Sequence, residues 1–288
     1  MLVRTLFCFA LLALFFVAPE TRSQEKPVAP ADLVGSQRGE LPIILSAPHG
    51  GTKKIPGVPE RTGAGMPKGG AGFSVAFDSN TDLLLLEVAA AIQNKFGKKP
   101  YYVFARFSRR YVDANRPPEI AYEDPKAKPI YEAYHDTLAL HCRDVNKAFK
   151  CGLLLDIHGQ GSARDTIFRG TQNGKTVSLL RERFGEKAHT GPKSFFGILN
   201  ALEMKVHPTL PDAKERAGFT GGHIVQKYGS KNYGIDAIQL ECGFDYRDKT
   251  KLKDVARNDR DNVMTQTYLT SDTGKVYTML AHAAGRLR

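Results

Sequence analysis

Short apolar runs that alternate with amphipathic segments are the feature that most limits how this chain of 288 residues can fold. Four runs have the length and composition of buried strands, and segments with helical periodicity separate them. The expected strands cover residues 41–46, 101–105, 152–158 and 237–241, and the expected helices cover residues 80–96, 130–149, 175–184, 249–262 and 271–286. This alternation predicts an α/β fold: a single domain with a mixed, mostly parallel sheet and helices on both faces.

The N-terminal segment has the layout of a secretory signal peptide. Arg4 precedes an apolar run over residues 6–18, and a polar segment follows. The run is shorter than the roughly 20 residues that a membrane span requires. We therefore expect a signal peptide over residues 1–23, a flexible leader over residues 24–40 and one domain over residues 41–288. An uncleaved membrane anchor is the alternative. A signal peptide that is cleaved predicts an exported protein, periplasmic or extracellular, that is not stably inserted in a membrane.

The distribution of charge and the number of cysteines argue against a nucleic-acid-binding protein and against a disulfide-rich protein. The formal net charge is +11, which would suit nucleic acid, an anionic envelope surface or acidic small substrates. Lysines and arginines are spread along the chain without a nucleic-acid-binding signature, so we expect no nucleic-acid partner. Cys142, Cys151 and Cys242 follow the signal, an odd number without metal-ligand spacing. They predict free thiols rather than a disulfide framework, with a single bridge as the alternative.

Polar side chains stand where three of the expected strands end. His49 follows the first strand, Asp156 and His158 end the third, and Gln239 and Glu241 end the fourth. Ligands of open α/β sheets bind at this edge, and side chains two residues apart share one face of a strand. Burying such groups without partners costs about 2–7 kcal/mol each. A metal ion is one partner that would satisfy several at once, and hydrogen bonds or salt bridges are the alternative.

The requirements of a catalytic zinc site suggest a role for each of the polar residues at the strand ends. A catalytic zinc takes three ligands from histidine, aspartate or glutamate, and a nearby carboxylate moves protons. His49 and His158 are candidate ligands, and Glu241 is a candidate general base and acid. The loop over residues 50–72 is long for a compact domain, so we expect it to border the site.

Four motifs in fixed order carry a resemblance to a known family. They are SAPHGG from Ser46, SRRYVDANRP from Ser108, DIHG from Asp156 and AIQLE from Ala237. Together they resemble the motif series of the N-formylglutamate amidohydrolases over about residues 40–260. The resemblance implies a phosphorylase/hydrolase-like fold similar to that of zinc carboxypeptidases. It also implies one Zn²⁺ per chain, bound by His49 and His158, with Glu241 as the catalytic carboxylate.

At the position of the third metal ligand, the sequence differs from the carboxypeptidase pattern. That pattern places a glutamate three residues after the first histidine, where this chain has Thr52. We expect Asp78 to be the ligand, because it precedes a predicted helix whose N-terminus favours a carboxylate. Helix capping is its alternative role, and Glu60 is the alternative ligand.

The resemblance also suggests how substrate is held. Asn115 and Arg116 resemble the pair that grips a substrate carboxylate in related carboxypeptidases, and the planar fork of an arginine suits that contact. Asp113 is expected to orient a neighbouring arginine such as Arg110 or to form a structural salt bridge.

A glycine pair completes the expected site. Gly221 and Gly222 resemble a family glycine pair at which the backbone approaches the substrate closely, and the adjacent His223 is a candidate supporting residue.

These features predict an exported zinc-dependent amidohydrolase that cleaves an N-formyl or N-acyl amino acid. Its partner would be a small amide or peptide that bears a carboxylate, with Glu241 and Arg116 as catalytic residues. A zinc carboxypeptidase or peptidoglycan amidase is one alternative function. A non-catalytic anion-binding protein is the other.

Overall fold

The computed structural model describes residues 29–67, 72–201, 203–209, 211 and 214–248. The expected signal peptide and the expected helices at 249–262 and 271–286 lie outside the described residues. Among the described residues, no helix combines the length and the apolar character that a membrane crossing requires. Cys142, Cys151 and Cys242 are free thiols, as expected.

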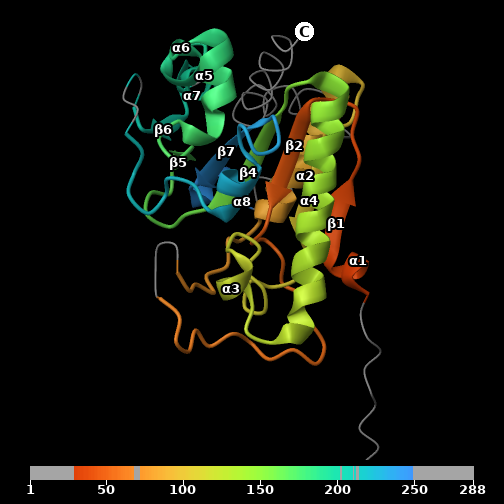
Figure 1. Cartoon of the computed structure of the whole chain (residues 1–288). Coiled ribbons are helices and arrows are strands. Elements are labelled where there is room, and N and C mark those ends of the chain that lie inside the picture. The colour runs from red at the N-terminus through yellow and green to blue at the C-terminus, as the bar shows by residue number, and fades with distance from the viewer. Residues whose placement is uncertain (1–28, 68–71, 202, 210, 212–213, 249–288) are drawn as a thin grey trace, which may run out of the picture.

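A mixed sheet with the strand order β1-β3-β2-β4-β7-β5-β6 forms the centre of the described chain (Figure 1). β1 runs antiparallel to β3 and β5 runs antiparallel to β7, whereas the other neighbouring pairs are parallel. The expected α/β fold with a mostly parallel sheet is therefore confirmed. The strands are β1 Val34–Gln37, β2 Ile43–Ala47, β3 Tyr101–Ala105, β4 Leu153–Gly159, β5 Thr166–Gly170, β6 Lys205–His207 and β7 Asp236–Cys242.

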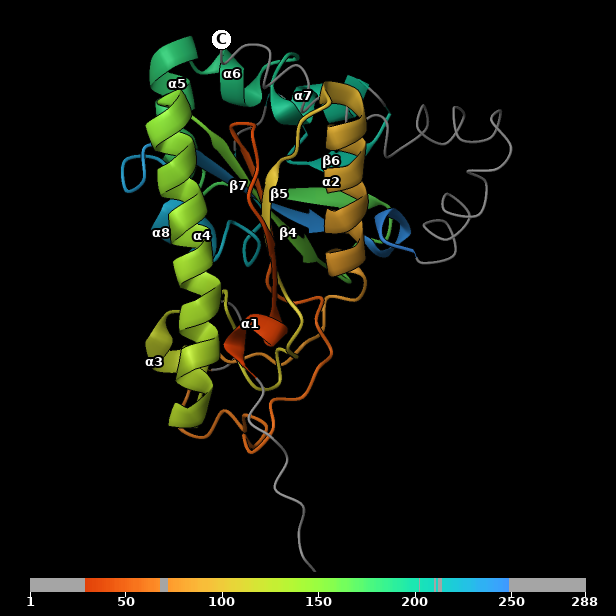
Figure 2. The same cartoon turned by 90° about the vertical axis from the view of Figure 1, so that its right-hand side faces the viewer.

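Two long helices cover opposite faces of the sheet, α2 (Thr81–Phe96) and α4 (Lys128–Phe149) (Figure 2). In α2, Leu85 and Ile92 face a core that includes Leu45 of β2, and in α4 Leu138 joins the core on the other face. Gly97 ends α2 in the left-handed conformation that glycine adopts without steric cost. The shorter helices are α1 Pro30–Leu33, α3 Pro118–Ala121, α5 Ser178–Phe184, α6 Lys187–Thr190, α7 Phe195–Ala201 and α8 His223–Tyr228, with 3₁₀ turns at Pro125–Ala127, Lys175–Val177 and Phe244–Tyr246.

The prediction of a flexible leader over residues 24–40 is wrong for residues 30–37. α1 and β1 lie there, and β1 pairs with β3 along its whole length. Leu33 is almost fully buried in the core on the α4 face. The segment contributes few apolar residues of its own, so its order depends on the pairing with β3 rather than on a local pattern.

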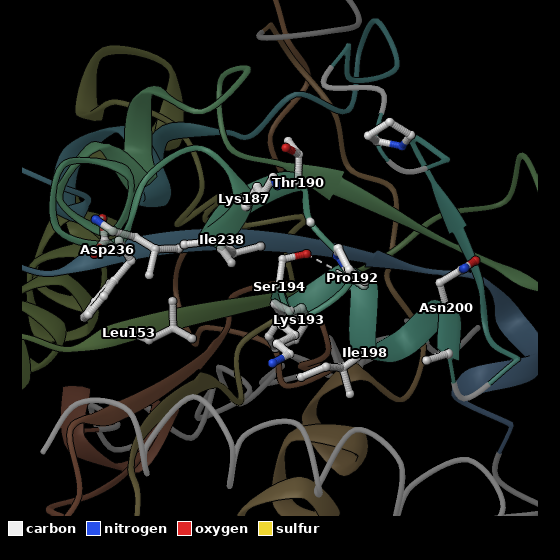
Figure 3. Close-up of a pocket in the computed structure, with 18 of the residues that line it drawn as sticks. Leu153, Lys187, Thr190, Pro192, Lys193, Ser194, Ile198, Asn200, Asp236 and Ile238 are labelled. Carbon is white, nitrogen blue, oxygen red and sulfur yellow. Dashed lines mark hydrogen bonds between the residues drawn. The ribbon is translucent and has the colours of Figure 1, made fainter.

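A cavity of about 890 Å³ lies at the amino ends of β4 and β7 and is also lined by residues of α5, α6 and α7. Figure 3 shows the side chains around it. Leu153 and Asp236, the first residues of β4 and β7, both line it. This is the edge of the sheet opposite to the strand ends that carry His158 and Glu241. The cavity is therefore separate from the polar motifs.

Asp236 at this cavity predicts a measurable pH dependence of stability. Burial raises the pKa of its carboxyl group to about 6, while the Leu180 amide donates a hydrogen bond to it. The folded state then holds a proton more tightly than the unfolded state, so this group's contribution to stability falls as the pH rises from about 4 to above 6. Each pKa unit is worth about 1.4 kcal/mol. Asp236→Asn keeps the acceptor oxygen but cannot ionise.

We expect Asp236→Asn to gain about 2 kcal/mol of unfolding free energy relative to wild type between pH 4 and pH 7. Urea unfolding of both proteins at the two pH values measures this difference. Equal pH dependence in the two proteins would show that Asp236 ionises as freely in the folded chain as in the unfolded one.

Candidate metal centre

Three side chains meet at the carboxyl ends of the neighbouring parallel strands β2 and β4. His49 follows β2 by two residues, His158 lies near the end of β4, and Asp78 lies in the loop that leads into α2. The Asp78 amide donates to the His49 carbonyl (3.3 Å), which holds this loop against the end of β2. All three residues are more than nine-tenths buried. The sequence-based expectation that they lie close together is therefore met.

Three ligand atoms of these residues form a small triangle. Nδ1 of His49 lies 3.1 Å from Oδ2 of Asp78, Nδ1 of His158 lies 3.1 Å from Nδ1 of His49, and Nδ1 of His158 lies 3.3 Å from the same Asp78 oxygen. Atoms that share one ion at bonds of about 2.1 Å are separated by roughly 3–3.5 Å. The spacing thus suits one small cation.

The opposite ring nitrogens show which atoms offer lone pairs. Nε2 of His49 lies 2.7 Å from Oδ1 of Asp113, and Nε2 of His158 lies 2.9 Å from Oδ2 of Asp156. A carboxylate can only accept, so each Nε2 carries a proton and donates it. In the neutral rings both Nδ1 atoms then direct a lone pair toward the Asp78 carboxylate, as in the carboxylate–histidine–metal arrangement of metalloenzymes. The two lone pairs and the carboxylate oxygen face one another and would repel, so a positive charge is needed between them.

The pKa of His158 also indicates that this position attracts positive charge. Burial alone would lower it, but the nearby carboxylates of Asp156 and Asp78 outweigh burial and raise the pKa of His158 to about 10. The position therefore favours a cation, either a proton or a metal ion, and the two compete because a ligand nitrogen must be deprotonated.

Glu241 adds a carboxyl group beside the triad. It lies opposite His158 in the β4–β7 register and is mostly buried. Burial raises the pKa of Glu241 to about 7, and the Gln239 side-chain amide donates to its Oε1 (2.8 Å). A carboxyl group with a pKa near neutral can both accept and return a proton, which general acid–base catalysis requires.

Comparison with solved structures identifies the fold of this chain. The crystal structure of N-formylglutamate amidohydrolase from Ralstonia eutropha JMP134 has a TM-score of 0.55 and 14% identity, covering 90% of this chain and 99% of that one. This chain has the fold of N-formylglutamate amidohydrolase. The similarity that the motifs suggested is confirmed at the level of fold. No protein-family model matches the sequence, and no curated protein does.

Two further solved structures are more distantly similar. A gene product of Agrobacterium tumefaciens has a TM-score of 0.48 and 17% identity, covering 88% of this chain and 98% of its own. The N-acetylmuramyl-L-alanine amidase of Mycobacterium smegmatis has a TM-score of 0.34 and 9% identity, covering 85% and 97%.

The loop after β3 supplies Asp113, the partner of Nε2 of His49. Asp113 accepts from Nε of Arg109 (2.8 Å) and from the Asn115 amide (3.0 Å) in addition to its contact with His49. The expectation that Asp113 orients a neighbouring arginine or forms a salt bridge is met by Arg109, whereas Arg110, the arginine named as the example, points outward to Glu60 (3.1 Å). The same half-exposed ion pair places Glu60 outside the metal cluster, so Glu60 is not the third ligand.

Asn115 and Gly222 contact side chains of the neighbouring strands β4 and β7. The Asn115 side-chain amide lies 3.2 Å from Nε2 of His158 and donates to Oε1 of Gln239 (3.3 Å), and its oxygen accepts from the amide of Ile224 (2.8 Å). The Gly222 amide also donates to Gln239 (2.7 Å). A Cβ at Gly222 would lie 2.3 Å from the Asn115 side chain, so the close approach of Asn115 requires glycine there. Asn115 thus organises the site, and its contact with substrate stays a prediction, as do those of Gly221 and Gly222.

Arg116 lies in the same loop and is mostly buried. Its Nε donates to the Gly72 carbonyl (2.7 Å) and its Nη1 to the Asn115 carbonyl (3.0 Å). Burial lowers the pKa of Arg116, while Asp113, Asp78 and Glu241 act in the opposite direction. The guanidinium is therefore close enough to the triad for electrostatic interaction, and its grip on a substrate carboxylate stays a prediction.

His223 begins α8 beside Gly222, with its ring 5.6 Å from that of His135. No hydrogen bond among the described residues links it to the triad. Its supporting role stays a prediction.

Proposed function

We propose that this protein is a metal-dependent amidohydrolase that holds one Zn²⁺ through His49, Asp78 and His158. The observation that supports the proposal is the convergence of two histidine lone pairs and one carboxylate oxygen within 3.3 Å of one another. This set of nitrogen and oxygen donors is one that zinc uses in catalytic sites. The fold shared with N-formylglutamate amidohydrolase supports an amide as the bond that is cleaved.

The proposed reaction is hydrolysis of an N-formyl or N-acyl amino acid. A bound divalent ion supplies a Lewis acid that polarises the amide carbonyl and lowers the pKa of water. Glu241 accepts the proton of the attacking water and returns it to the leaving nitrogen, a role that its buried position opposite His158 in the β4–β7 register supports. Gln239 holds the Glu241 carboxyl group in place. Asp113 and Asp156 hold the two histidines in the tautomer that presents Nδ1.

Arg116 is proposed to bind a carboxylate of the substrate and so to align the amide. Hydrogen bonds to the backbone carbonyls of Gly72 and Asn115 fix the side chain before substrate arrives. A pre-positioned side chain loses less freedom on binding and gives better alignment. This role implies a preference for amides that carry a free carboxylate.

Export to the periplasm or the cell exterior is part of the proposal. The layout of residues 1–23 supports it, and the proposed partner is a small amide or peptide rather than nucleic acid. An exported enzyme would act on amides that reach it outside the cytoplasm.

A metal analysis combined with a substrate screen tests the proposal. We expect about one zinc per chain in the purified protein and hydrolysis of N-formyl or N-acetyl amino acids, with activity lost to a chelator and restored by Zn²⁺. Peptides and peptidoglycan fragments belong in the same screen. Faster cleavage of these would favour the carboxypeptidase or peptidoglycan amidase alternative, and absence of both metal and activity would refute an enzymatic role.

Arg116→Lys is the matched variant for this screen. Lysine keeps the charge but lacks the bidentate fork, and a hydrogen bond to a charged group contributes about 1.5–3 kcal/mol. We expect kcat/KM to fall about tenfold or more for substrates with a free carboxylate and to change little for esters or amides of the same compounds. Equal losses for both kinds of substrate would indicate a purely structural arginine.

A further inference from the structure

Arg247 lies just after β7 and directs its side chain into the protein, where the residue is 6% exposed. Its Nε donates to the Cys242 carbonyl (3.2 Å) and its Nη2 to the Gln160 carbonyl (3.4 Å). Its Nη1 donates to the carbonyl (2.7 Å) and the hydroxyl (2.5 Å) of Ser79. One guanidinium thus binds four neutral acceptors on three separate segments.

Each of these segments carries a residue of the candidate metal centre. Cys242 follows Glu241, Gln160 comes two residues after His158, and Ser79 follows Asp78. The contact with the Asp78 loop is reciprocal, because the Asn80 side chain donates to the Arg247 carbonyl (2.8 Å). The guanidinium therefore joins the loop that carries Asp78 to the ends of β4 and β7.

Gly159 shows how closely this contact fits. A Cβ at Gly159 would lie 2.8 Å from the guanidinium carbon of Arg247, so the absence of a side chain lets the arginine lie against the end of β4. The amide of the same Gly159 donates to Oδ2 of Asp78 (3.2 Å), the oxygen that faces both histidines. Arg247 and the Asp78 carboxylate are thus held by the same short stretch of backbone.

We infer that Arg247 is a positioning residue that fixes Asp78 against His49 and His158 and so sets the affinity for the metal ion. The inference rests on the proposed metal centre. Asp78 lies outside the sheet, on a loop, whereas His158 is held within a strand. A ligand on a loop needs such support, because metal affinity falls when the groups that orient a ligand are removed.

The test measures Zn²⁺ affinity directly, on the full chain stripped of metal, by competition with a chromophoric chelator. Arg247→Met removes all four hydrogen bonds and is expected to raise the Kd for Zn²⁺ about tenfold or more, the range seen for groups that orient metal ligands. Ser79→Ala removes only the hydroxyl acceptor on the Asp78 loop. It is expected to raise the Kd about threefold, since the Ser79 carbonyl contact remains.

Arg164→Met is the matched control. Arg164 and Arg247 both lie over the ring of Phe244, at 4.9 and 5.5 Å, but the Arg164 side chain is exposed and binds Asp245. Its loss should leave the Kd unchanged. Thermal unfolding of each metal-free variant separates a general loss of stability, which a merely structural arginine would cause, from a loss of metal affinity.

The outcomes distinguish this inference from the proposed function. Absence of Zn²⁺ binding by the unaltered protein would overturn the metal centre and the role of Arg247 with it. Wild-type Kd values in both Arg247→Met and Ser79→Ala, or an equal rise in Arg164→Met, would overturn the role of Arg247 alone. If Arg247→Met fails to fold, Ser79→Ala decides, and an unchanged Kd in that variant contradicts the inference.

Discussion

Replacing Glu241 by glutamine is expected to lower kcat by about 10²-fold or more while the metal site remains filled. Glutamine keeps the size of the side chain and an oxygen that can accept the hydrogen bond from Gln239. It cannot accept the proton of the attacking water, which is the role proposed for this carboxyl group. Steady-state kinetics on the preferred substrate, with metal content measured on the same samples, separates the two properties.

Asp236→Asn is the control for this substitution. It makes the same change from carboxyl to amide on the same strand, but at the opposite end of β7. Its kcat should match that of the wild type. A Glu241→Gln variant with normal kcat would assign the proton transfer to another group, and one that lost its metal would place Glu241 among the ligands.

The sequence predicts the central strands well because each is an apolar run buried on both faces. The expected strand 101–105 coincides with β3, and the bounds of β2, β4 and β7 differ from expectation by one or two residues. β5 was not predicted, since its Thr-Ile-Phe-Arg-Gly sequence contains an arginine. Arg169 is fully buried there and binds Glu215, 46 residues away (3.0 Å). A partner so distant in the chain leaves no local pattern.

In the candidate site, the residues at strand ends could be predicted from the sequence, whereas those in irregular loops are harder to place. His49 and His158 could be placed together because neighbouring parallel strands end at one edge of a sheet. The sequence does contain a signal for the partner of His158, because Asp156 is a carboxylate two residues before it on the same face of the strand. The carboxylate that pairs with Nε2 of His49 could not be found in this way. Asp113 lies in a loop without periodicity, and its choice of Arg109 over Arg110 depends on the path of that loop.

The substitutions His49→Ala and His158→Ala are each expected to reduce zinc occupancy to a small fraction of one per chain and to abolish activity. Each removes one of the three donor atoms that lie 3.1–3.3 Å apart. It also leaves a buried carboxylate, Asp113 or Asp156, without the ring that it now binds. Two remaining ligands do not make a closed zinc site, for which three protein ligands are the usual minimum.

Metal-dependent stability distinguishes loss of the ion from loss of the fold. Zinc that binds only the folded state stabilises it by about 2.7 kcal/mol at a free concentration of 100 times Kd, so the wild type should show a zinc-induced rise in Tm and the two variants should not. His141→Ala is the matched control, because His141 is as buried as His158 but lies in α4 against Tyr101. It should lose some stability and keep the full zinc response. Full zinc occupancy in the double variant would show that the ion binds elsewhere, and the convergence of His49, Asp78 and His158 would then be explained by a shared proton.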